Sequence, residues 1–154
     1  MTINIVLYSP EIPQNTGNIS RTCAVTGARL HIIKPIGFEI SDRTLKRAGL
    51  DYWDKLDVTY YENYEDFLLK NPDGVKYYFS AHAEHSYADA EYPDGVYLIF
   101  GRESVGLPRE LVEENADFSL RIPMRKTLRC LNLSNSVAIA AYEVLRKNNF
   151  EGLE

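Results

Sequence analysis

Cysteine is scarce in this sequence, which has only Cys23 and Cys130 among 154 residues. Two cysteines cannot build a disulfide framework, and neither lies in a CxxC pair or near a histidine, so no structural zinc site is expected. The sequence also lacks any window of 18 or more apolar residues, which argues against a transmembrane helix. No basic stretch followed by an apolar stretch precedes the first strand-like run, which argues against a secretory signal. These absences predict a reduced, cytoplasmic protein without a metal site.

Positive charge is in the minority, because the net charge is −5, and this value alone argues against a nucleic-acid partner. The distribution of the charge argues otherwise. Residues 15–47 hold six basic and two acidic side chains, and residues 121–129 hold four basic and no acidic ones, so each segment carries +4 and the rest carries −13. Folded surfaces are often patchy, but this polarity also fits a protein with one face for an anionic ligand and an acidic back.

The length and composition predict one globular domain over residues 1–154, since 45% of the residues are hydrophobic and 25% are charged. Apolar runs predict strands at 3–8, 29–34, 58–61, 76–80, 96–100 and 119–122. Helical patterns predict helices at 15–26, 41–48, 64–70 and 133–147, and a short helix opening at Pro108. Strands that alternate with helices predict an α/β fold, with a mostly parallel sheet covered by helices on both faces. The acidic, irregular segment 81–93 has no clear assignment.

The first polar segment, EIPQNTGNISR, covers Glu11 to Arg21. Asn15 suits the N-cap of the predicted helix, and Gly17 allows a ligand or a backbone to approach closely. Asn15, Asn18 and Arg21 are spaced by three, so successive members are neighbours on a helix. Helix amides, carboxamides and a guanidinium suit a phosphate or a ribose. A well-capped surface helix with an ordinary arginine is the equally weighted alternative.

The second segment, LIFGRESVGLP, covers Leu98 to Pro108 and follows a buried strand. Gly101 comes directly after that strand and Gly106 five residues later. Ligands of parallel sheets bind outside the carboxyl ends of the strands, where this turn is expected. The turn lacks the lysine of a Walker loop and the GxGxxG pattern, while Glu103 is suited to hold an arginine or a ribose hydroxyl. The alternative is a glycine-rich turn before a helix that begins with proline.

The third segment, IPMRKTLRCLNLSNSVAIAAYE, covers residues 122–143. It joins a strand end, a basic loop, a polar turn and a long helix. Capping explains the polar residues 132–136, and core packing explains the small apolar residues 137–141. Neither explains why three basic residues come first, namely Arg125, Lys126 and Arg129.

Other candidates are weaker. His31 lies within a predicted strand and is expected to be structural. His82 and His85 match a metal site only loosely, since no third ligand is evident. One face of the predicted helix 41–48 is basic, and a solvated face is its default interpretation; its residues are Arg43, Lys46 and Arg47.

Taken together, NTGNISR, LIFGRESVGLP and IPM…LNLSNSVAIAAYE resemble the three signature motifs of the SPOUT superfamily of RNA methyltransferases, and the resemblance covers essentially the whole chain. The segments EIPQNTGN and GF…LKRAGLDYW and the short length are most similar to the minimal single-domain group. That group methylates the ribose 2′-oxygen of the wobble nucleotide, cytidine or uridine, in tRNA. The resemblance implies a deep trefoil knot near the C-terminus, which general topology rules would have excluded.

The resemblance also implies a cofactor and the residues around it. The cofactor is S-adenosylmethionine, bound in a bent shape mostly through backbone groups and released as S-adenosylhomocysteine. The implied cofactor-binding residues are Phe79, Gly101, Gly106, Ile122, Cys130, Leu131 and Asn132. Cys130 stands where the family often has serine.

Family members are homodimers with the active site at the interface, so Arg21 would reach the reacting ribose from the partner subunit. Five residues are implied to position Arg21, the ribose and the cofactor, namely Asn15, Asn18, Glu103, Ser134 and Tyr142. The small residues of the last helix that would pack the dimer are Ala138, Ala140 and Ala141. The residues implied to hold tRNA phosphates are Arg43, Lys46, Arg47, Arg125, Lys126 and Arg129. Methyl transfer from a sulfonium needs alignment but no metal.

Three alternatives stay open at this point. The first is a 2′-O-methyltransferase that acts on ribosomal RNA, against which the short chain weighs. The second is a tRNA-binding module without turnover, against which the intact polar residues of the motifs weigh. The third is a nucleotide-binding regulator of the doubly wound class, which would bind a nucleotide and ignore the methyl donor.

Overall fold

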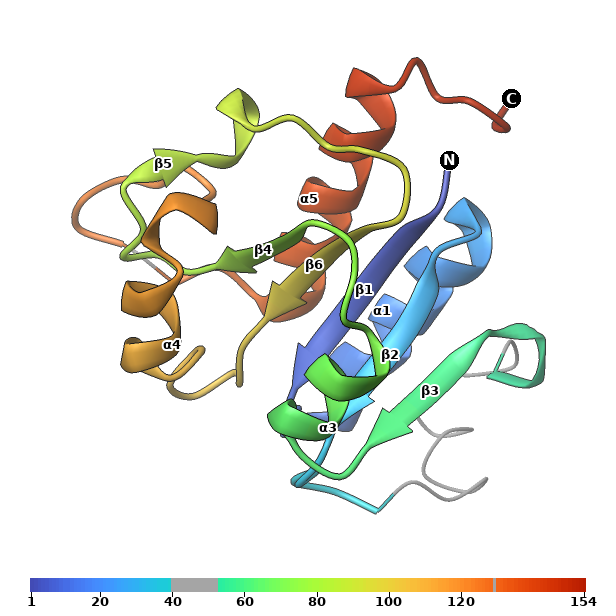
Figure 1. Cartoon of the computed structure of the whole chain (residues 1–154), viewed down its shortest axis with the longest axis horizontal. Coiled ribbons are helices and arrows are strands. Elements are labelled where there is room, and N and C mark those ends of the chain that lie inside the picture. The colour runs from blue at the N-terminus through green and yellow to red at the C-terminus, as the bar shows by residue number, and fades with distance from the viewer. Residues whose placement is uncertain (40–52, 129) are drawn as a thin grey trace.

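A seven-stranded sheet runs through the computed structural model, which describes residues 1–39, 53–128 and 130–154. The strand order is β3-β2-β1-β6-β4-β7-β5 (Figure 1). The strands are β1 (Ile3–Tyr8), β2 (Arg29–Ile33), β3 (Val58–Tyr61), β4 (Lys76–Phe79), β5 (His85–Ser86), β6 (Val96–Phe100) and β7 (Ser119–Arg121). Each neighbouring pair of these strands is parallel, so the predicted mostly parallel sheet is confirmed. The trefoil knot stays a prediction.

Helices cover both faces of the sheet, as predicted. In Figure 1, α3 and α4 lie in front of the sheet and α1 and α5 behind it. The helices are α1 (Pro13–Thr26), α3 (Tyr64–Lys70), α4 (Arg109–Glu114) and α5 (Leu133–Lys147), and three short 3-10 turns are η1 (Trp53–Lys55), η2 (Tyr87–Asp89) and η3 (Ala116–Phe118). The helix expected at 41–48 lies outside the described residues. Within the described part of the chain, no helix has the length and apolar content needed to cross a membrane.

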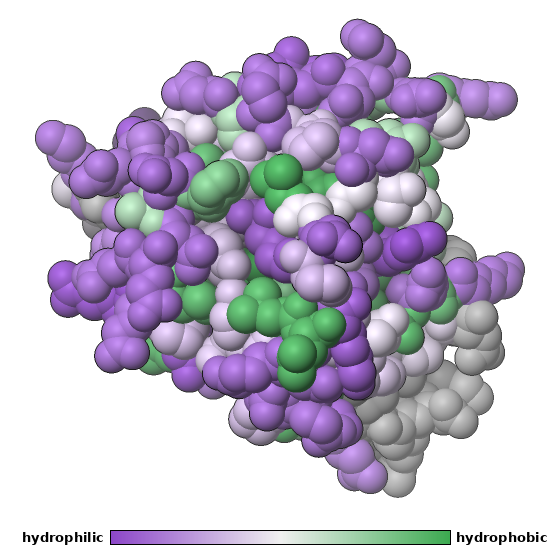
Figure 2. All heavy atoms as spheres, in the orientation of Figure 1, coloured by the Kyte–Doolittle hydropathy of each residue, from purple (hydrophilic) through white to green (hydrophobic). Residues whose placement is uncertain are grey.

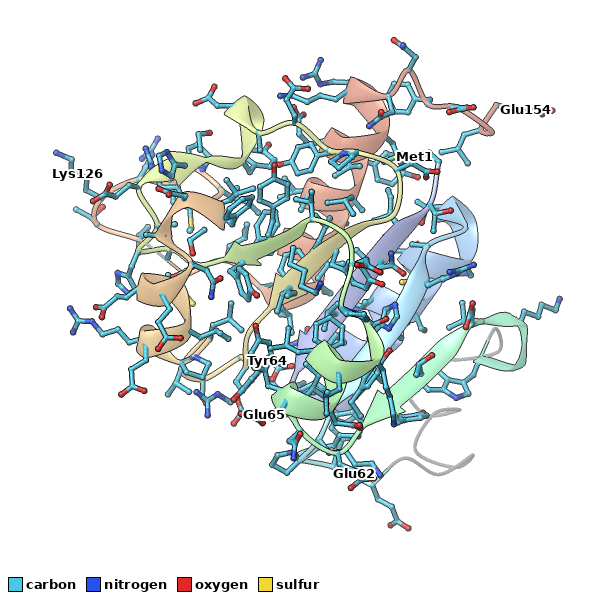
Figure 3. The ribbon with its side chains drawn as sticks, in the orientation of Figure 1. Met1, Glu62, Tyr64, Glu65, Lys126 and Glu154 are labelled. Carbon is cyan, nitrogen blue, oxygen red and sulfur yellow. The ribbon has the colours of Figure 1, made fainter. Side chains whose placement is uncertain are left out.

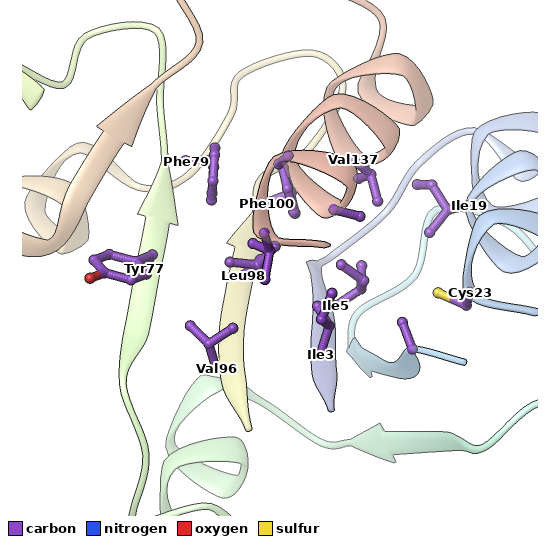
Figure 4. Close-up of a cluster of buried hydrophobic side chains, with 14 of the residues drawn as sticks. Ile3, Ile5, Ile19, Cys23, Tyr77, Phe79, Val96, Leu98, Phe100 and Val137 are labelled. Carbon is purple, nitrogen blue, oxygen red and sulfur yellow. The ribbon is translucent and has the colours of Figure 1, made fainter. Parts of the chain in front are cut away.

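Alternation along the strands produces two separate cores. Ile3, Ile5 and Leu7 of β1 belong to the larger core, which α1 and α5 cover, while Val6 belongs to the smaller core under α3 and α4. Figure 4 shows side chains of β1 and β6 meeting Val137 of α5 in the larger core. On the opposite side, Figure 2 shows hydrophilic side chains around the rim of the molecule and hydrophobic ones in patches near its middle. Both faces of the sheet are therefore sealed by amphipathic elements.

Two details of the sequence interpretation are wrong. Asn15 is not an N-cap, because α1 begins at Pro13, Ile12 is its N-cap, and the Asn15 amide donates to the Ile12 carbonyl at 3.1 Å. The physical reason is that proline, with its fixed φ, favours the first helical position. Strand β5 was also missed, since its two residues have no apolar pattern and pair only with the edge of β7.

The strand order places a crevice between β1 and β6. From β1 the chain moves outward through β2 and β3, whereas β6, β4 and β7 lie on the other side of β1. The loops that follow β1 and β6 therefore leave the same edge of the sheet and diverge. In parallel sheets such a switch point is where ligands bind, outside the carboxyl ends of the strands.

His31 is structural, as predicted, and it joins a buried polar network. Its Nε2 lies 2.9 Å from the Asn4 side-chain oxygen, and its Nδ1 lies 2.8 Å from the Tyr61 hydroxyl. The Asn4 side-chain nitrogen donates to the Gly95 carbonyl, so the Asn4 oxygen accepts, and Nε2 must carry the proton. Nδ1 then accepts from Tyr61, whose oxygen accepts in turn from Asn71. The network is complete only when the imidazole is neutral.

Acid is expected to destabilise the protein through His31. Burial lowers its pKa to about 4 from the ordinary 6.5. Between pH 6.5 and 4 the unfolded chain binds a proton at His31 and the folded protein does not. The free energy of unfolding therefore falls by about 3 kcal/mol in total as the pH falls from 6.5 to 4. Urea unfolding at fixed protein concentration and several pH values measures this slope. His31→Gln should flatten it, whereas His85→Gln, at an exposed position, should not. Equal slopes in all three proteins would contradict the assignment.

Candidate functional site

A cavity of about 950 Å³ opens at the carboxyl ends of β4 and β6, on the β6 side of the expected crevice between β1 and β6. Three segments form its walls: residues 79–82 after β4, residues 100–109 after β6, and residues 130–133 before α5. Ile122 and Met124, just after β7, also line it, as do Val112 and Glu113 of α4 and Ser136 of α5. The volume lies within the range of small-molecule and cofactor sites.

Each of the seven residues predicted to bind the cofactor lines this cavity, although they come from four separate segments of the chain. The ring of Phe79 stacks on that of Phe100, with centroids 4.6 Å apart and an interplanar angle of 18°. Both rings are buried, at 8% and 2% exposure, while Ile122 and Leu131 are the more open apolar residues of the cavity wall. The structure therefore brings together the residues that the resemblance grouped.

The turn after β6 makes one wall of the cavity from backbone. The Gly106 amide donates to the Arg102 carbonyl at 2.9 Å, and Gly106 has a φ of +69°. A Cβ atom on Gly101 would overlap the Gly106 carbonyl carbon and the Leu107 amide nitrogen, so glycine is required there. The Arg102 guanidinium lies over the Tyr8 ring, 5.7 Å from its centroid. The turn is thus folded back tightly against the following residues, Gly106 and Leu107.

Asn132 connects the two long helices at the cavity edge. Its side-chain oxygen caps α5, accepting from the Ser134 amide at 2.9 Å, the Ser134 hydroxyl at 2.6 Å and the Asn135 amide at 3.3 Å. Its side-chain nitrogen donates to the Asn15 side-chain oxygen at 3.1 Å. Asn15 and Ser134 are both buried, so their predicted positioning role would be exerted through Asn132.

The residues predicted to act on the ribose occupy two places. Glu103 lines the cavity; its Oε2 accepts from the Glu11 amide at 2.7 Å, while its buried Oε1 has no hydrogen-bond partner among the described residues. Asn18 and Arg21 lie exposed on α1, and Tyr142, 45% exposed, lies on α5. None of these three lines the cavity. Within one chain, the cavity and this helix surface are separate parts of the predicted site.

Of the residues predicted to bind RNA, the structure describes two. Arg125 and Lys126 are exposed on the loop between β7 and α5, and Lys126 extends away from the body of the protein (Figure 3). The others, Arg43, Lys46, Arg47 and Arg129, lie outside the described residues. The dimer-packing prediction is wrong for Ala140 and Ala141, which are fully buried in the protein's own core because this face of α5 packs on the sheet and on α1.

The sequence interpretation missed several cavity residues. Phe100 ends a predicted strand, so its position at a carboxyl strand end was the available indication. Ser104 and Met124 lie inside the second and third polar segments but were given no role, and His82 was considered only as a metal ligand. Among the described residues, no three His, Cys, Asp or Glu side chains are grouped so that they would hold a metal ion.

Comparison with known proteins agrees with this geometry. A model of the SpoU rRNA methylase family matches residues 2–142. The chain belongs to this family. The SpoU-family chain is 45% identical to a tRNA (cytidine(34)-2′-O)-methyltransferase of Escherichia coli (strain K12), over 97% of this chain and 96% of the relative.

Solved structures of related enzymes share its fold. One, described as "Structural insights into the 2-OH methylation of C/U34 on tRNA", is 43% identical, covers 97% of this SpoU-family chain and 98% of its own, and superposes with a TM-score of 0.91. Another is an AdoMet-bound rRNA methyltransferase from Sinorhizobium meliloti, at 25% identity and a TM-score of 0.81, over 94% of this chain and 56% of that one.

Proposed function

We propose that this protein transfers a methyl group from S-adenosylmethionine to the ribose 2′-hydroxyl of the wobble nucleotide, cytidine or uridine, in tRNA. The observation that carries the proposal is the cavity at the carboxyl ends of β4 and β6, which gathers all seven predicted cofactor residues. The similarity over nearly full length to enzymes named for this reaction supports the choice of substrate.

The cavity suits the methyl donor in both shape and chemistry. Ile122 and Leu131, backed by the stacked Phe79 and Phe100 rings, would contact an adenine, and the turn at Gly101 would meet its polar edges. The carboxylate of Glu103, a wall residue of the cavity, would accept a hydrogen bond from a hydroxyl or an ammonium group of the donor. When bound, the donor supplies an electrophilic methyl group on a sulfonium and leaves as S-adenosylhomocysteine.

Arg21 is the residue that would act on the ribose. A sugar hydroxyl is a poor nucleophile at neutral pH, so the charge that develops on its oxygen must be stabilised as the methyl group transfers. A guanidinium donates hydrogen bonds and keeps its proton, so Arg21 would orient and polarise the hydroxyl, while an RNA phosphate oxygen takes the proton. Asn18, one turn earlier on α1, would hold Arg21 in place.

A homodimer would join the two parts of the site. Arg21 and Tyr142 lie on exposed helix surface outside their own cavity, so a second copy that packs on α1 and α5 would bring its Arg21 to this cavity. Exposed apolar side chains on the same helices support such packing, since Ile139 of α5 is 38% exposed and Ile12, beside α1, is 42% exposed.

A methyl-transfer assay on separate RNA fractions tests the proposal. Purified protein is incubated with radiolabelled S-adenosylmethionine and either total tRNA or ribosomal RNA, and mass spectrometry locates the modified nucleotide. Label on the ribose of the wobble nucleotide is expected. Label found only in ribosomal RNA would show that ribosomal RNA, not tRNA, is the substrate. Binding of the donor without any labelled RNA would indicate a tRNA-binding module without turnover. Binding of nucleotides but not of the donor would indicate a nucleotide-binding regulator.

Arg125 and Lys126 are expected to bind tRNA phosphates. Replacing both with alanine should weaken tRNA binding about tenfold at moderate salt and reduce the dependence of log K on log salt by about 2, because two phosphate contacts are lost. Affinity for the methyl donor should stay unchanged. Filter binding at several salt concentrations measures both quantities, with the exposed Lys55→Ala as control. An unchanged dependence of log K on log salt would show that this loop does not contact tRNA phosphates.

A further inference from the structure

Reciprocal hydrogen bonds join the loop after β1 to the turn after β6. The Glu11 carboxylate accepts from the Ser104 amide at 3.0 Å and from the Ser104 hydroxyl at 2.7 Å. In return, the Glu11 amide donates to the Glu103 carboxylate at 2.7 Å. We call this arrangement, formed by Glu11, Glu103 and Ser104, the glutamate clasp. It connects positions about 90 residues apart in sequence across the crevice between β1 and β6.

The clasp uses charged acceptors for main-chain donors. The Ser104 amide and then the Ser104 hydroxyl hold the pKa of Glu11 below its ordinary value, and the nearby Arg102 guanidinium acts in the same direction. Glu11 is therefore an anion at neutral pH, and hydrogen bonds to an anion are stronger than those between neutral groups. A turn that would otherwise end in exposed amides is fixed at its tip by a side chain from another loop.

The clasp bears directly on the cavity, although Glu11 does not line it. Ser104 and Glu103 are both wall residues, and they lie between Gly101 and Gly106, where the turn folds back on itself. The bond from the Glu11 amide fixes Oε2 of Glu103, while the other oxygen, Oε1, is buried and has no hydrogen-bond partner among the described residues. The position of the turn and the orientation of Glu103 thus both depend on Glu11.

We propose that Glu11 is a positioning residue for the methyl-donor site, where it holds the 101–107 turn in the conformation that binds the donor. This rests on the proposed function, since the donor defines which conformation is the productive one. Glu11 touches neither the cavity nor the ribose site, so its effect is exerted through Ser104 and Glu103.

Calorimetry with S-adenosylhomocysteine tests the proposal. Glu11→Ala should weaken binding about tenfold, because two hydrogen bonds to a charged acceptor are lost. Glu11→Gln keeps an acceptor oxygen for Ser104 and should stay within about threefold of the original protein. Ser104→Ala should weaken binding about threefold alone but add nothing to Glu11→Ala, because the two residues act through one contact. Additive losses, or an unchanged affinity in Glu11→Ala, would overturn it.

Kinetics separates positioning from general destabilisation. In Glu11→Ala, KM for the donor should rise about tenfold, while KM for tRNA and the unfolding temperature stay close to those of the original protein. Glu62→Ala is the matched control, since Glu62 follows β3 and its exposed carboxylate pairs with Lys34 at 3.3 Å, away from the cavity. It should change neither constant. If the unfolding temperature of Glu11→Ala fell enough to explain the whole rise in KM for the donor, the positioning role would be overturned.

Hydrogen exchange in the donor-free protein tests the clasp apart from the function. The Ser104 amide should exchange at least about tenfold faster in Glu11→Ala, because its acceptor is gone, while amides of β1 should keep their rates. Unchanged exchange would overturn the clasp even if the protein methylates tRNA. Failure of the original protein to bind the donor would overturn the proposed function and, with it, the role of Glu11. Faster exchange of the Ser104 amide in Glu11→Ala would still show that Glu11 contacts Ser104.

Discussion

Arg21→Ala is expected to lower the rate of methyl transfer about a thousandfold, while affinity for S-adenosylhomocysteine stays unchanged. The rate should fall because a donor aimed at the developing oxyanion stabilises the transition state far more than the ground state, and loss of one such donor costs a factor of about 100 to 1,000. Cofactor affinity should survive because Arg21 lies on exposed α1 surface and does not line the cavity. Single-turnover methylation and calorimetry measure the two effects separately.

Two further variants sharpen this test. Arg21→Lys keeps the charge but loses the planar fork, so its rate should lie between those of the original protein and Arg21→Ala. Arg29→Ala is the control, because Arg29 is an exposed arginine paired with Asp57 at 3.2 Å, at the amino end of β2 and away from the cavity. Full activity in Arg21→Ala would remove Arg21 from the mechanism, and loss of cofactor binding would give it a structural role instead.

The sequence predicted the elements of this fold better than their arrangement. Runs such as Val58–Tyr61 and Val96–Phe100 begin and end where apolar and turn residues change, so local pattern was enough. The order of the strands, and the two-residue β5, depend on contacts between distant segments, which local pattern does not encode. The start of α1 is a different case, because Pro13 is a local signal for the first helical position and Asn15, also a good capping residue, lies two residues later.

The site divides in the same way. Its polar turns were visible because glycine, asparagine and arginine follow predicted strands, but only the resemblance joined them into one cofactor site. Glu11 stood inside a quoted motif without a role, since its partner Ser104 lies about 90 residues away. Ala140 and Ala141 were assigned to a dimer surface because small residues fit both a subunit interface and a tightly packed core, and composition does not distinguish the two.

Gly101→Ala is expected to weaken donor binding at least about a hundredfold. The new methyl group would overlap backbone atoms of Gly106 and Leu107, which no side-chain rotation relieves, so the turn must open. Calorimetry measures the affinity, and thermal unfolding shows whether the fold survives, with a cost of about 1–3 kcal/mol expected from overpacking.

Gly95→Ala is the matched control for this substitution. Gly95 precedes the same strand, β6, at its other end, and a Cβ atom there would meet no atom within 4 Å. Its φ of +82° makes alanine unfavourable, so stability should fall by about 1 kcal/mol while donor affinity stays unchanged. Equal donor affinities in the two variants would show that the turn at Gly101 does not form the donor site.

Mixing the two inactive variants decides whether the site is shared between subunits. An Arg21→Ala chain keeps an intact cavity, and a Gly101→Ala chain keeps its arginine. If Arg21 serves the partner's cavity, each mixed dimer has one complete site, and random pairing should restore about a quarter of the original activity. If Arg21 serves its own cavity, no complete site forms and activity stays at background. Co-expression with two different tags allows the mixed dimer to be isolated, so absence of activity there would contradict the shared site.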